Sequence, residues 1–214
     1  MFANAPFAAR TLVLAACAAC VALATAWAAR AEVRDIHFVR AGSELGLAQN
    51  TITALAQDAD GFVWVGTQGG LSRYDGQRFV SFREQPGDAN SLQDNFVTAL
   101  AADAKDGLWI GTRAGYVSRL DLGDGRFHRY PRAGAYTPQV EALLPAGGAT
   151  WIGTSAGLDR LDPASGRITR ILALPAQGGD NGAQGLARDR RGDVWYANRA
   201  GLFRVGADAR ALRI

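Results

Sequence analysis

Few side chains in this chain of 214 residues could carry out chemistry. Both cysteines, Cys17 and Cys20, lie in an apolar N-terminal stretch, and the two histidines are His37 and His128. Elimination or hydrolysis needs a general base, often with metal ligands beside it. We expect both histidines to lie on peripheral strands, so the sequence predicts no catalytic residue, no bound metal and no cofactor.

Polar side chains that could bind a ligand recur at one place in a repeat. Four residues after successive tryptophans stand Gln68, Arg113, Ser155 and Arg199. Because equivalent positions of a repeat share one face, we expect these residues to ring that face, with Tyr136 in a neighbouring loop. Arginine and tyrosine there could bind carboxylate or sugar groups. The alternative is that they are ordinary solvated turn residues.

Tryptophans anchor the repeat that positions these side chains. The anchors are Trp64, Trp109, Trp151 and Trp195, which lie 45, 42 and 44 residues apart. A period of about 20 to 50 residues indicates stacked or circular repeats. We expect each indole to fill the space between neighbouring sheets, where an aromatic side chain buries about 150 to 250 Å².

Each repeat is typical of four short strands joined by tight turns. The expected strands of the first unit are 52–57, 62–67, 71–74 and 78–82, and those of the second are 97–102, 108–112, 116–122 and 126–130. Their residues are rich in β-branched and aromatic types, and Gly-containing turns separate them. No segment after the N-terminal stretch shows helical periodicity. The predicted fold is all-β, with four four-stranded antiparallel β-propeller blades over residues 36–214.

The expected turns repeat an aspartate six residues before the tryptophan. Asp58, Asp103 and Asp189 stand there, and Pro145 takes the corresponding place in the third unit. We expect each carboxylate to accept backbone N–H groups within its turn, with a following glycine at positive φ. A calcium site is the alternative, but blades fan outward and separate equivalent residues too far to share one ion.

Three asparagines precede the first strands of their units. They are Asn50, Asn95 and Asn181, each fourteen residues before a tryptophan. We expect their amides to tie down the connection from the preceding blade, with ligand contact as the alternative.

Residues 1–31 read as a signal peptide. Arg10 precedes the apolar stretch 11–28, and small residues at 26–28 or 29–31 suit cleavage. We therefore expect a signal helix and export to the periplasm. An uncleaved anchor in the inner membrane is the alternative, because about 18 apolar residues only just suffice to cross a bilayer.

The charge excludes nucleic acid as a partner. The chain has 23 basic and 20 acidic residues, and removal of Arg10 and Arg30 with residues 1–31 leaves 21 against 20. Phosphate binding needs a concentrated basic face, which a mature charge of +1 does not suggest.

The motifs resemble the two-component regulator propeller repeat. The resemblance is carried by 46–52, 60–67 and 70–76, and it extends from about Asp35 to Arg204. In that family, exported sensors carry seven-bladed propellers ahead of a membrane helix and a histidine kinase or diguanylate cyclase, and many detect carbohydrate. The resemblance implies a noncatalytic periplasmic ligand-sensing region whose ligand is unknown, with carbohydrate as the first candidate.

Four units fall short of seven, so we expect an incomplete propeller, truncated before its output domain. Any membrane contact would come through an uncleaved leader or a missing C-terminal part. Residues 36–40 resemble a fourth strand and could serve as a closing strand, and 211–214 could supply the outer strand of the fourth unit.

Two other functions fit the same pattern. Streptogramin-lyase-like propellers have similar Asp-Gly-x-x-Trp repeats and catalyse metal-assisted elimination, for which this chain offers only its two histidines. The rigid faces of a propeller also suit a protein-interaction module.

Overall fold

The computed structural model describes residues 39–132, 137–174, 182–206 and 211–214. The chain divides into two units, Met1–Arg40 and Ala41–Ile214. Apart from one 3-10 turn, η1 (Ser43–Leu45), every regular element among the described residues is a strand. The predicted signal helix and residues 36–38 of the predicted closing strand lie outside the described residues. No helix of the described residues is long and apolar enough to cross a membrane.

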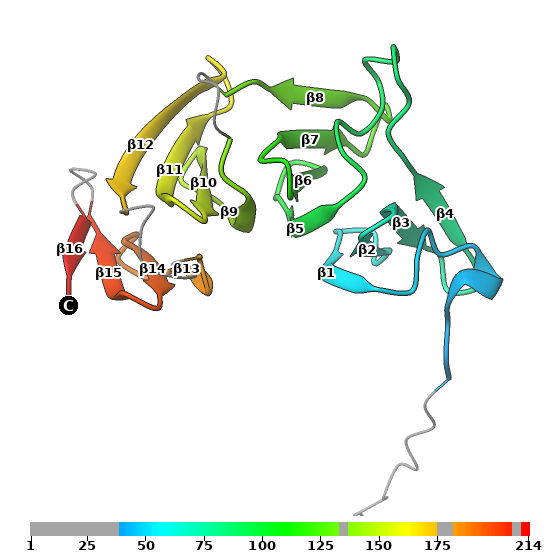
Figure 1. Ribbon diagram of the computed structural model, residues 1–214, viewed down its shortest axis with the longest axis horizontal. Coiled ribbons are helices and arrows are strands. Elements are labelled where there is room, and N and C mark those ends of the chain that lie inside the picture. Colours follow the sequence, from blue (N-terminus) through cyan, green and yellow to red (C-terminus); the bar gives the residue numbers. More distant parts are fainter. Residues whose placement is uncertain (1–38, 133–136, 175–181, 207–210) are drawn as a thin grey trace, which may run out of the picture. The chain divides into compact units, whose positions relative to one another are not determined.

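Four antiparallel sheets follow one another along the chain within Ala41–Ile214 (Figure 1). The first sheet consists of β1 (Ile52–Gln57), β2 (Val63–Thr67), β3 (Gly70–Tyr74) and β4 (Phe79–Phe82). The second consists of β5 (Val97–Ala102), β6 (Gly107–Thr112), β7 (Val117–Asp121) and β8 (Phe127–Tyr130). The third consists of β9 (Val140–Ala146), β10 (Ala149–Thr154), β11 (Gly157–Asp162) and β12 (Arg167–Ala173). The fourth consists of β13 (Gly185–Arg188), β14 (Val194–Asn198), β15 (Gly201–Val205) and β16 (Ala211–Arg213).

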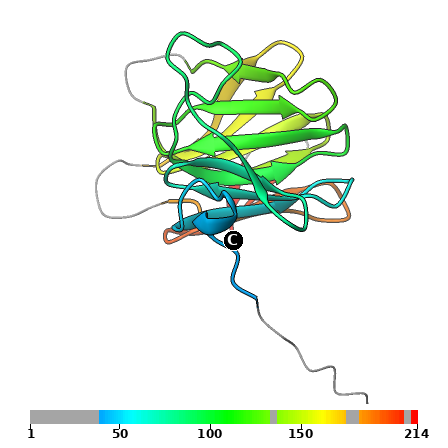
Figure 2. The ribbon, with the colours of Figure 1, turned by 90° about the vertical axis from the view of Figure 1, so that its right-hand side faces the viewer.

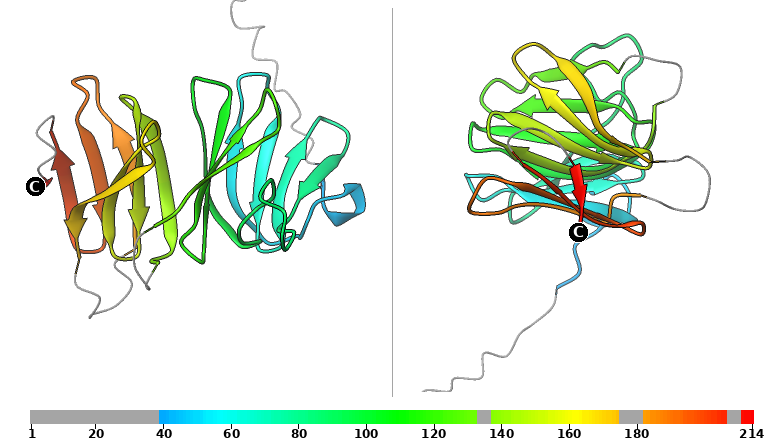
Figure 3. Two further views of the ribbon diagram at one scale, coloured as in Figure 1. Left: turned by 90° about the horizontal axis from the view of Figure 1, so that it is seen from above. Right: turned by 90° about the vertical axis from the view of Figure 1, so that its left-hand side faces the viewer.

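The strands of each sheet pair in chain order, which is the predicted meander. Figure 3 shows the strands of each sheet side by side. In the first two units every strand begins and ends within one residue of the predicted position. The prediction of four four-stranded propeller blades is therefore confirmed, as is the outer strand at the end of the chain.

Figure 2 shows the successive sheets layered on one another. The predicted tryptophans pack between them. Trp64 packs on the second sheet, Trp109 on the third and Trp151 on the fourth. Their exposed fractions are 1%, 2% and 8%. Trp195 lies on the opposite face of the fourth sheet from that core and is half-buried. The central strands β6 and β10 are buried along their whole length because sheets cover both of their faces.

The glycine two residues after each of the first three tryptophans lets the next sheet approach closely. A Cβ added at Gly66 would stand 2.7 Å from Val97 Cγ1, and one added at Gly153 would stand 2.6 Å from Ala183 Cβ. Gly111 meets Val140 in the same way. The second and third sheets therefore seat a valine of their first strand on a glycine of the sheet before, and the fourth sheet seats Ala183, just ahead of β13, in the same way.

The first strands, β1, β5, β9 and β13, lie on the inner side of the row of sheets, and the fourth strands lie on the outside (Figure 1). Hydroxyl groups join neighbouring first strands. Thr53 Oγ1 donates to the Val97 carbonyl and Thr98 Oγ1 donates to the Val140 carbonyl, each over 2.5 Å.

The aspartate turns form as predicted. Asp58 Oδ1 accepts the Phe62 N–H over 2.9 Å, and Gly61 has a φ of 89°. The second unit departs in detail, because Asp106 rather than a glycine takes the left-handed conformation there, with a φ of 52°. An aspartate tolerates this conformation better than most residues.

Two of the predicted asparagine ties are also present. Asn50 Oδ1 accepts the Ser43 N–H over 3.0 Å, and Asn95 Oδ1 accepts the Glu84 N–H over 2.8 Å. Asn181 lies outside the described residues. The two asparagines hold the chain where it enters the first and second sheets.

Candidate functional site

The turns that join second to third strands carry the predicted binding residues. Gln68, Arg113, Ser155 and Arg199 each follow the last residue of β2, β6, β10 or β14. Backbone N–H groups of the first three donate to the Thr51, Phe96 and Gln139 carbonyls over 3.4, 2.9 and 3.1 Å. The structure therefore places these residues equivalently, at one edge of successive sheets. Ser155 is half-buried and the other three are exposed. Tyr136 lies outside the described residues.

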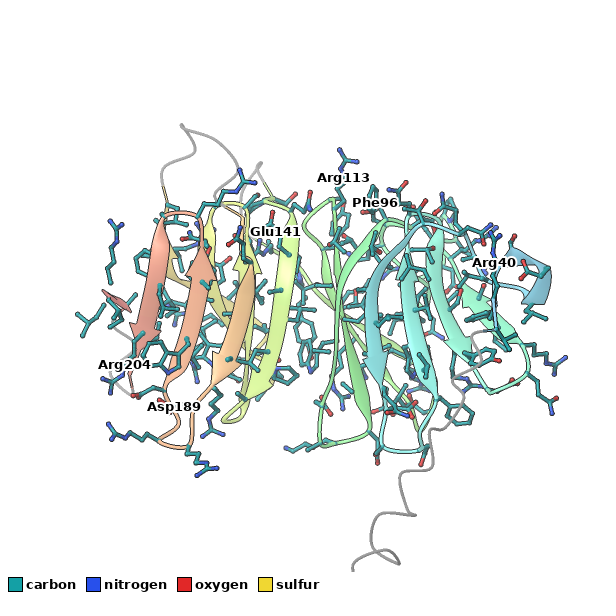
Figure 4. All side chains as sticks on the ribbon, turned by 90° about the horizontal axis from the view of Figure 1, so that it is seen from below. Arg40, Phe96, Arg113, Glu141, Asp189 and Arg204 are labelled. Atoms are coloured by element: carbon teal, nitrogen blue, oxygen red, sulfur yellow. The ribbon has the colours of Figure 1, made fainter. Side chains whose placement is uncertain are left out.

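Arg113 is the best-defined side chain of this edge. Its guanidinium carbon lies 5.0 Å from the centre of the Phe96 ring. Asp94 braces the same loop by accepting the Ala114 N–H over 3.0 Å. Figure 4 shows Arg113 projecting from the edge beside Phe96. A guanidinium held over an aromatic ring keeps its N–H groups available to a carboxylate or a sugar hydroxyl.

The inner strands line an open hollow of about 280 Å³ whose lining residues are leucines, alanines, threonines and one glutamate. One leucine comes from each sheet: Leu55, Leu100, Leu143 and Leu186. Glu141 contributes the hollow's carboxylate, which accepts the backbone N–H of Ala183. This carboxylate thus joins the third sheet to the chain entering the fourth.

The edge opposite the predicted binding residues holds a second repeated arrangement, which was not predicted from the sequence. The indole N–H of Trp64 donates to Asp58 over 2.7 Å, that of Trp109 to Asp103 over 2.9 Å, and that of Trp195 to Asp189 over 3.0 Å. Figure 4 shows Asp189 and Arg204 at this edge, away from Arg113 and Glu141. The constant six-residue spacing was the signal that could have revealed the bond.

In the second sheet the same carboxylate also binds an arginine. Arg119 Nε donates to Asp103 over 2.8 Å, and both side chains are mostly buried. Burial by itself raises the pKa of Asp103, but hydrogen bonds from Arg119, Lys105 N–H and Trp109 lower it overall. Asp103 therefore stays ionised inside the chain's own network.

The third sheet lacks this carboxylate, and the register shows why. Counting from Trp151 places Pro145 at the aspartate position, but pairing of Leu144 with Trp151 places Ala146 there. The turn is shorter because only Gly147 and Gly148 separate the two strands, with φ values of 62° and 75°. This tight hairpin turn leaves no room for the longer aspartate loop.

A buried ion cluster ties the connection before the third sheet to β11. Asp159 is 2% exposed and binds both Arg132 and Arg170. Burial lowers the pKa of Arg132, and the Asp159 carboxylate opposes that shift. Ser72, at the same register position of the first sheet, accepts the Ala48 N–H over 3.1 Å. At this register position the first and third sheets therefore both contact their incoming connection, the third through the ion pair of Asp159 with Arg132.

The described residues contain no group of three or more side chains of the histidine, cysteine, aspartate or glutamate type that could hold a metal ion. His128 lies exposed on the outer strand β8, where the sequence placed it. His37 lies outside the described residues.

Two segments of the repeat match a known protein family. Residues 46–69 and 91–114 match the family model described as two component regulator propeller. These segments match regulator propeller repeats. They run from the incoming connection through the second strand, and they include the turn residues Gln68 and Arg113. The predicted resemblance is confirmed in the first two units.

Similar proteins agree with this match. Histidine kinase P4 of Formosa agariphila is 40% identical over 47 residues, which is 22% of this chain and 3% of that protein. The extracellular domain of a putative hybrid two component system from B. thetaiotaomicron superimposes with a TM-score of 0.67 at 23% identity, covering 82% of this chain and 26% of that one. Virginiamycin B lyase from Staphylococcus aureus superimposes with a TM-score of 0.61 at 14% identity, covering 76% of this chain and 55% of the lyase.

These structural likenesses show the propeller fold, which hosts sensors and enzymes alike. The chain spans about a quarter of the length of the matched extracellular domain.

Proposed function

We propose that this chain is the noncatalytic ligand-sensing part of an exported two-component sensor, located in the periplasm. The observation that carries the proposal is the regulator propeller match over two consecutive units. The fold of the matched extracellular domain from a putative hybrid two component system supports it. Carbohydrate is the first ligand class to test.

The turn edge of Gln68, Arg113, Ser155 and Arg199 is the proposed binding surface, and the sequence adds Tyr136 as a further candidate. Three features support this choice: the residues are placed equivalently in successive sheets, three of them are exposed, and Arg113 is oriented by Phe96. Exposed turn residues carried on rigid strands are a common way to build a binding surface.

The test is calorimetric titration of the purified chain with neutral and acidic oligosaccharides. For a sugar that binds the wild type, we expect Arg113→Ala to weaken the affinity about tenfold, because one hydrogen bond to a charged group is lost. Arg126→Ala is the matched control, because its side chain is 74% exposed in the turn between β7 and β8, away from this edge. Equal weakening by both substitutions, or none by Arg113→Ala, would count against the proposed surface.

The noncatalytic part of the proposal has its own test. Because virginiamycin B lyase shares the propeller fold, the chain is incubated with a streptogramin B antibiotic and a divalent metal. We expect no turnover. Among the described residues the inner strands carry no histidine that could serve as a general base. Turnover that disappears on removal of the metal would refute this part.

Export is tested by fractionation and by N-terminal sequencing of the mature chain. We expect the protein in the periplasm with its N-terminus near residue 29 or 32, the two predicted cleavage positions. Recovery of the intact N-terminus in the membrane fraction would favour the anchor.

A further inference from the structure

Each sheet pairs its tryptophan with an arginine on the third strand. The cross-strand partners are Trp64 with Arg73, Trp109 with Arg119, Trp151 with Arg160 and Trp195 with Arg204. Partners opposite one another share a face of the sheet. An indole N–H donor and a guanidinium therefore stand together at one edge of every sheet.

Three sheets supply an acceptor for the indole N–H from within the chain, although Arg73 Nε of the first sheet is buried without a hydrogen-bond partner. The indole N–H groups of the first, second and fourth sheets donate to Asp58, Asp103 and Asp189. In the fourth sheet Arg204 Nε also donates to Asp193 over 2.7 Å. In these three sheets a carboxylate therefore accepts the indole N–H, and in the second and fourth sheets a carboxylate also binds the arginine.

The third sheet keeps the donors and lacks the acceptor. Ala146 occupies the aspartate position, and the turn of Gly147 and Gly148 brings no carboxylate. Within the described part of the chain, neither the Trp151 indole N–H nor the Arg160 guanidinium has a hydrogen-bond acceptor. Asp162 lies near enough to Arg160 to interact electrostatically, but its carboxylate already accepts Ser165 Oγ–H over 2.8 Å and the Ala164 N–H over 3.0 Å.

A cavity of about 480 Å³ opens in front of these donors, between the third and fourth sheets. Its lining includes Trp151, Arg160, Thr169, Ile171, Arg188 and Val194. No acidic side chain lines it. The fourth sheet buries Val194 and Tyr196 against Trp151, so by strand alternation its Asp193 and Arg204 point to the other face. The cavity therefore combines two guanidinium groups with an apolar wall and has a size common for small-ligand sites.

We propose that this cavity binds a small organic carboxylate. The carboxylate accepts the Trp151 indole N–H and the guanidinium N–H groups of Arg160 and Arg188, replacing the aspartate that the other sheets carry. The body of the ligand lies against Ile171 and Val194. Arginine pairs strongly with carboxylates in such partly enclosed sites. The proposal does not depend on the proposed function, because the cavity lies at the opposite edge from Arg113.

The chain offers a sharp test, since one substitution can restore the missing acceptor. Ala146→Asp adds a carboxylate two residues beyond the strand partner of Trp151, as Asp58 stands beyond Ala56, the partner of Trp64. We expect this variant to bind its own Trp151 and Arg160, and so to lose the ligand. Arg160→Gln removes a donor without adding charge, and it keeps the test informative if the first variant folds poorly. Arg126→Gln is the control.

The probes are hexanoate and D-glucuronate, with hexanamide and glucuronamide as neutral partners, titrated by calorimetry and by tryptophan fluorescence. We expect at least one acid to bind about tenfold more tightly than its amide, and both Ala146→Asp and Arg160→Gln to weaken it about tenfold or more. Arg126→Gln keeps the wild-type affinity. The preferred acid identifies an apolar or a sugar body.

Failure of both acids to bind the wild type overturns the proposal. Equal binding of acid and amide overturns it too, because the site would then not recognise charge. If an acid binds and neither cavity variant weakens it, the carboxylate site lies elsewhere. A sugar whose binding is weakened by Arg113→Ala but not by the cavity variants would support the proposed function and would not support the cavity site. The two proposals can therefore be refuted independently.

Discussion

Replacement of Gly66 by alanine tests the packing between sheets. The new Cβ would stand 2.7 Å from Val97 Cγ1 and 3.3 Å from Val97 Cβ, well inside ordinary carbon contact distances. Val97 is fully buried in the cluster that also holds Trp64 and Ile110, so it has no free space to move into. The backbone at Gly66 is not left-handed, so the cost comes from overpacking alone.

Overpacking by one methyl group lowers the free energy of unfolding by about 1 to 3 kcal/mol. For a chain of this size that lowers the melting temperature by about 2 to 12 °C. The matched control is Gly185→Ala, because a Cβ there has nothing within 4 Å. We expect the control to match the wild type or to be more stable by up to about 1 kcal/mol.

A double-mutant cycle with Val97→Ala identifies the contact. Val97→Ala alone should lower the free energy of unfolding by about 2 kcal/mol, through lost burial and the cavity left behind. In the double variant the added methyl group occupies part of that space, so the combined loss should be smaller than the sum by about 1 kcal/mol or more. Urea unfolding of the four proteins measures this. Additive losses, or equal losses at Gly66 and Gly185, would show that the close approach of the sheets is not the cause.

Three further predictions concern polar contacts. Asp103 has a lowered pKa because hydrogen bonds from Arg119 outweigh burial; its stabilisation is therefore present above about pH 4 and lost as pH falls through the folded-state pKa. Urea unfolding at pH 7 and pH 2 should show Asp103→Asn less stable than wild type at pH 7 and by a smaller margin at pH 2; a constant difference would contradict this. Asp159→Ala leaves Arg132 buried without its partner and should cost about 3 to 5 kcal/mol, with a loss below about 1 kcal/mol counting against the cluster. Asn95→Ala removes one exposed hydrogen bond and should cost about 0.5 to 1.5 kcal/mol, with faster amide exchange at Glu84 as its local sign.

The fold was predictable from the sequence because turn chemistry and repeat period agree. Glycine and aspartate mark the turns in every unit, and the strands between them are too short to begin or end elsewhere by more than a residue. The tryptophan spacing then fixes which sheets are equivalent. Burial of Trp64 and Trp109 follows directly, because equivalent faces of successive sheets must meet.

The Asp–Trp hydrogen bond could not be deduced from residue types alone. Asp58 was expected to cap its own turn, and it does, but its second oxygen also accepts the indole N–H of Trp64. The six-residue spacing signals the pair, and the direction of the indole within the sheet then establishes the bond. In the third unit, counting residues from Trp151 indicated Pro145, whereas the two-residue turn shifts the register to Ala146.

The repeat pattern could not predict contacts between residues that do not recur from unit to unit. Arg132 and Asp159 lie 27 residues apart, and the other units have no equivalent pair to signal them. The loop path that brings them together depends on the connection between two sheets, whose length varies along the chain. The predicted turn residues share one edge because that edge is set by the repeat itself.

Packing between sheets also bears on whether four blades could close on one another. In the first three sheets an alanine of the first strand faces a glycine of the second, as Ala54 faces Gly66, but in the fourth sheet Gly185 faces Ala197. The first sheet presents Ile52, 50% exposed, at the register position where the second sheet presents Val97. A valine already needs a glycine opposite it, so the larger Ile52 cannot seat on the methyl group of Ala197 in the same way. The contact that joins the described sheets is therefore unsuited to joining the fourth sheet to the first.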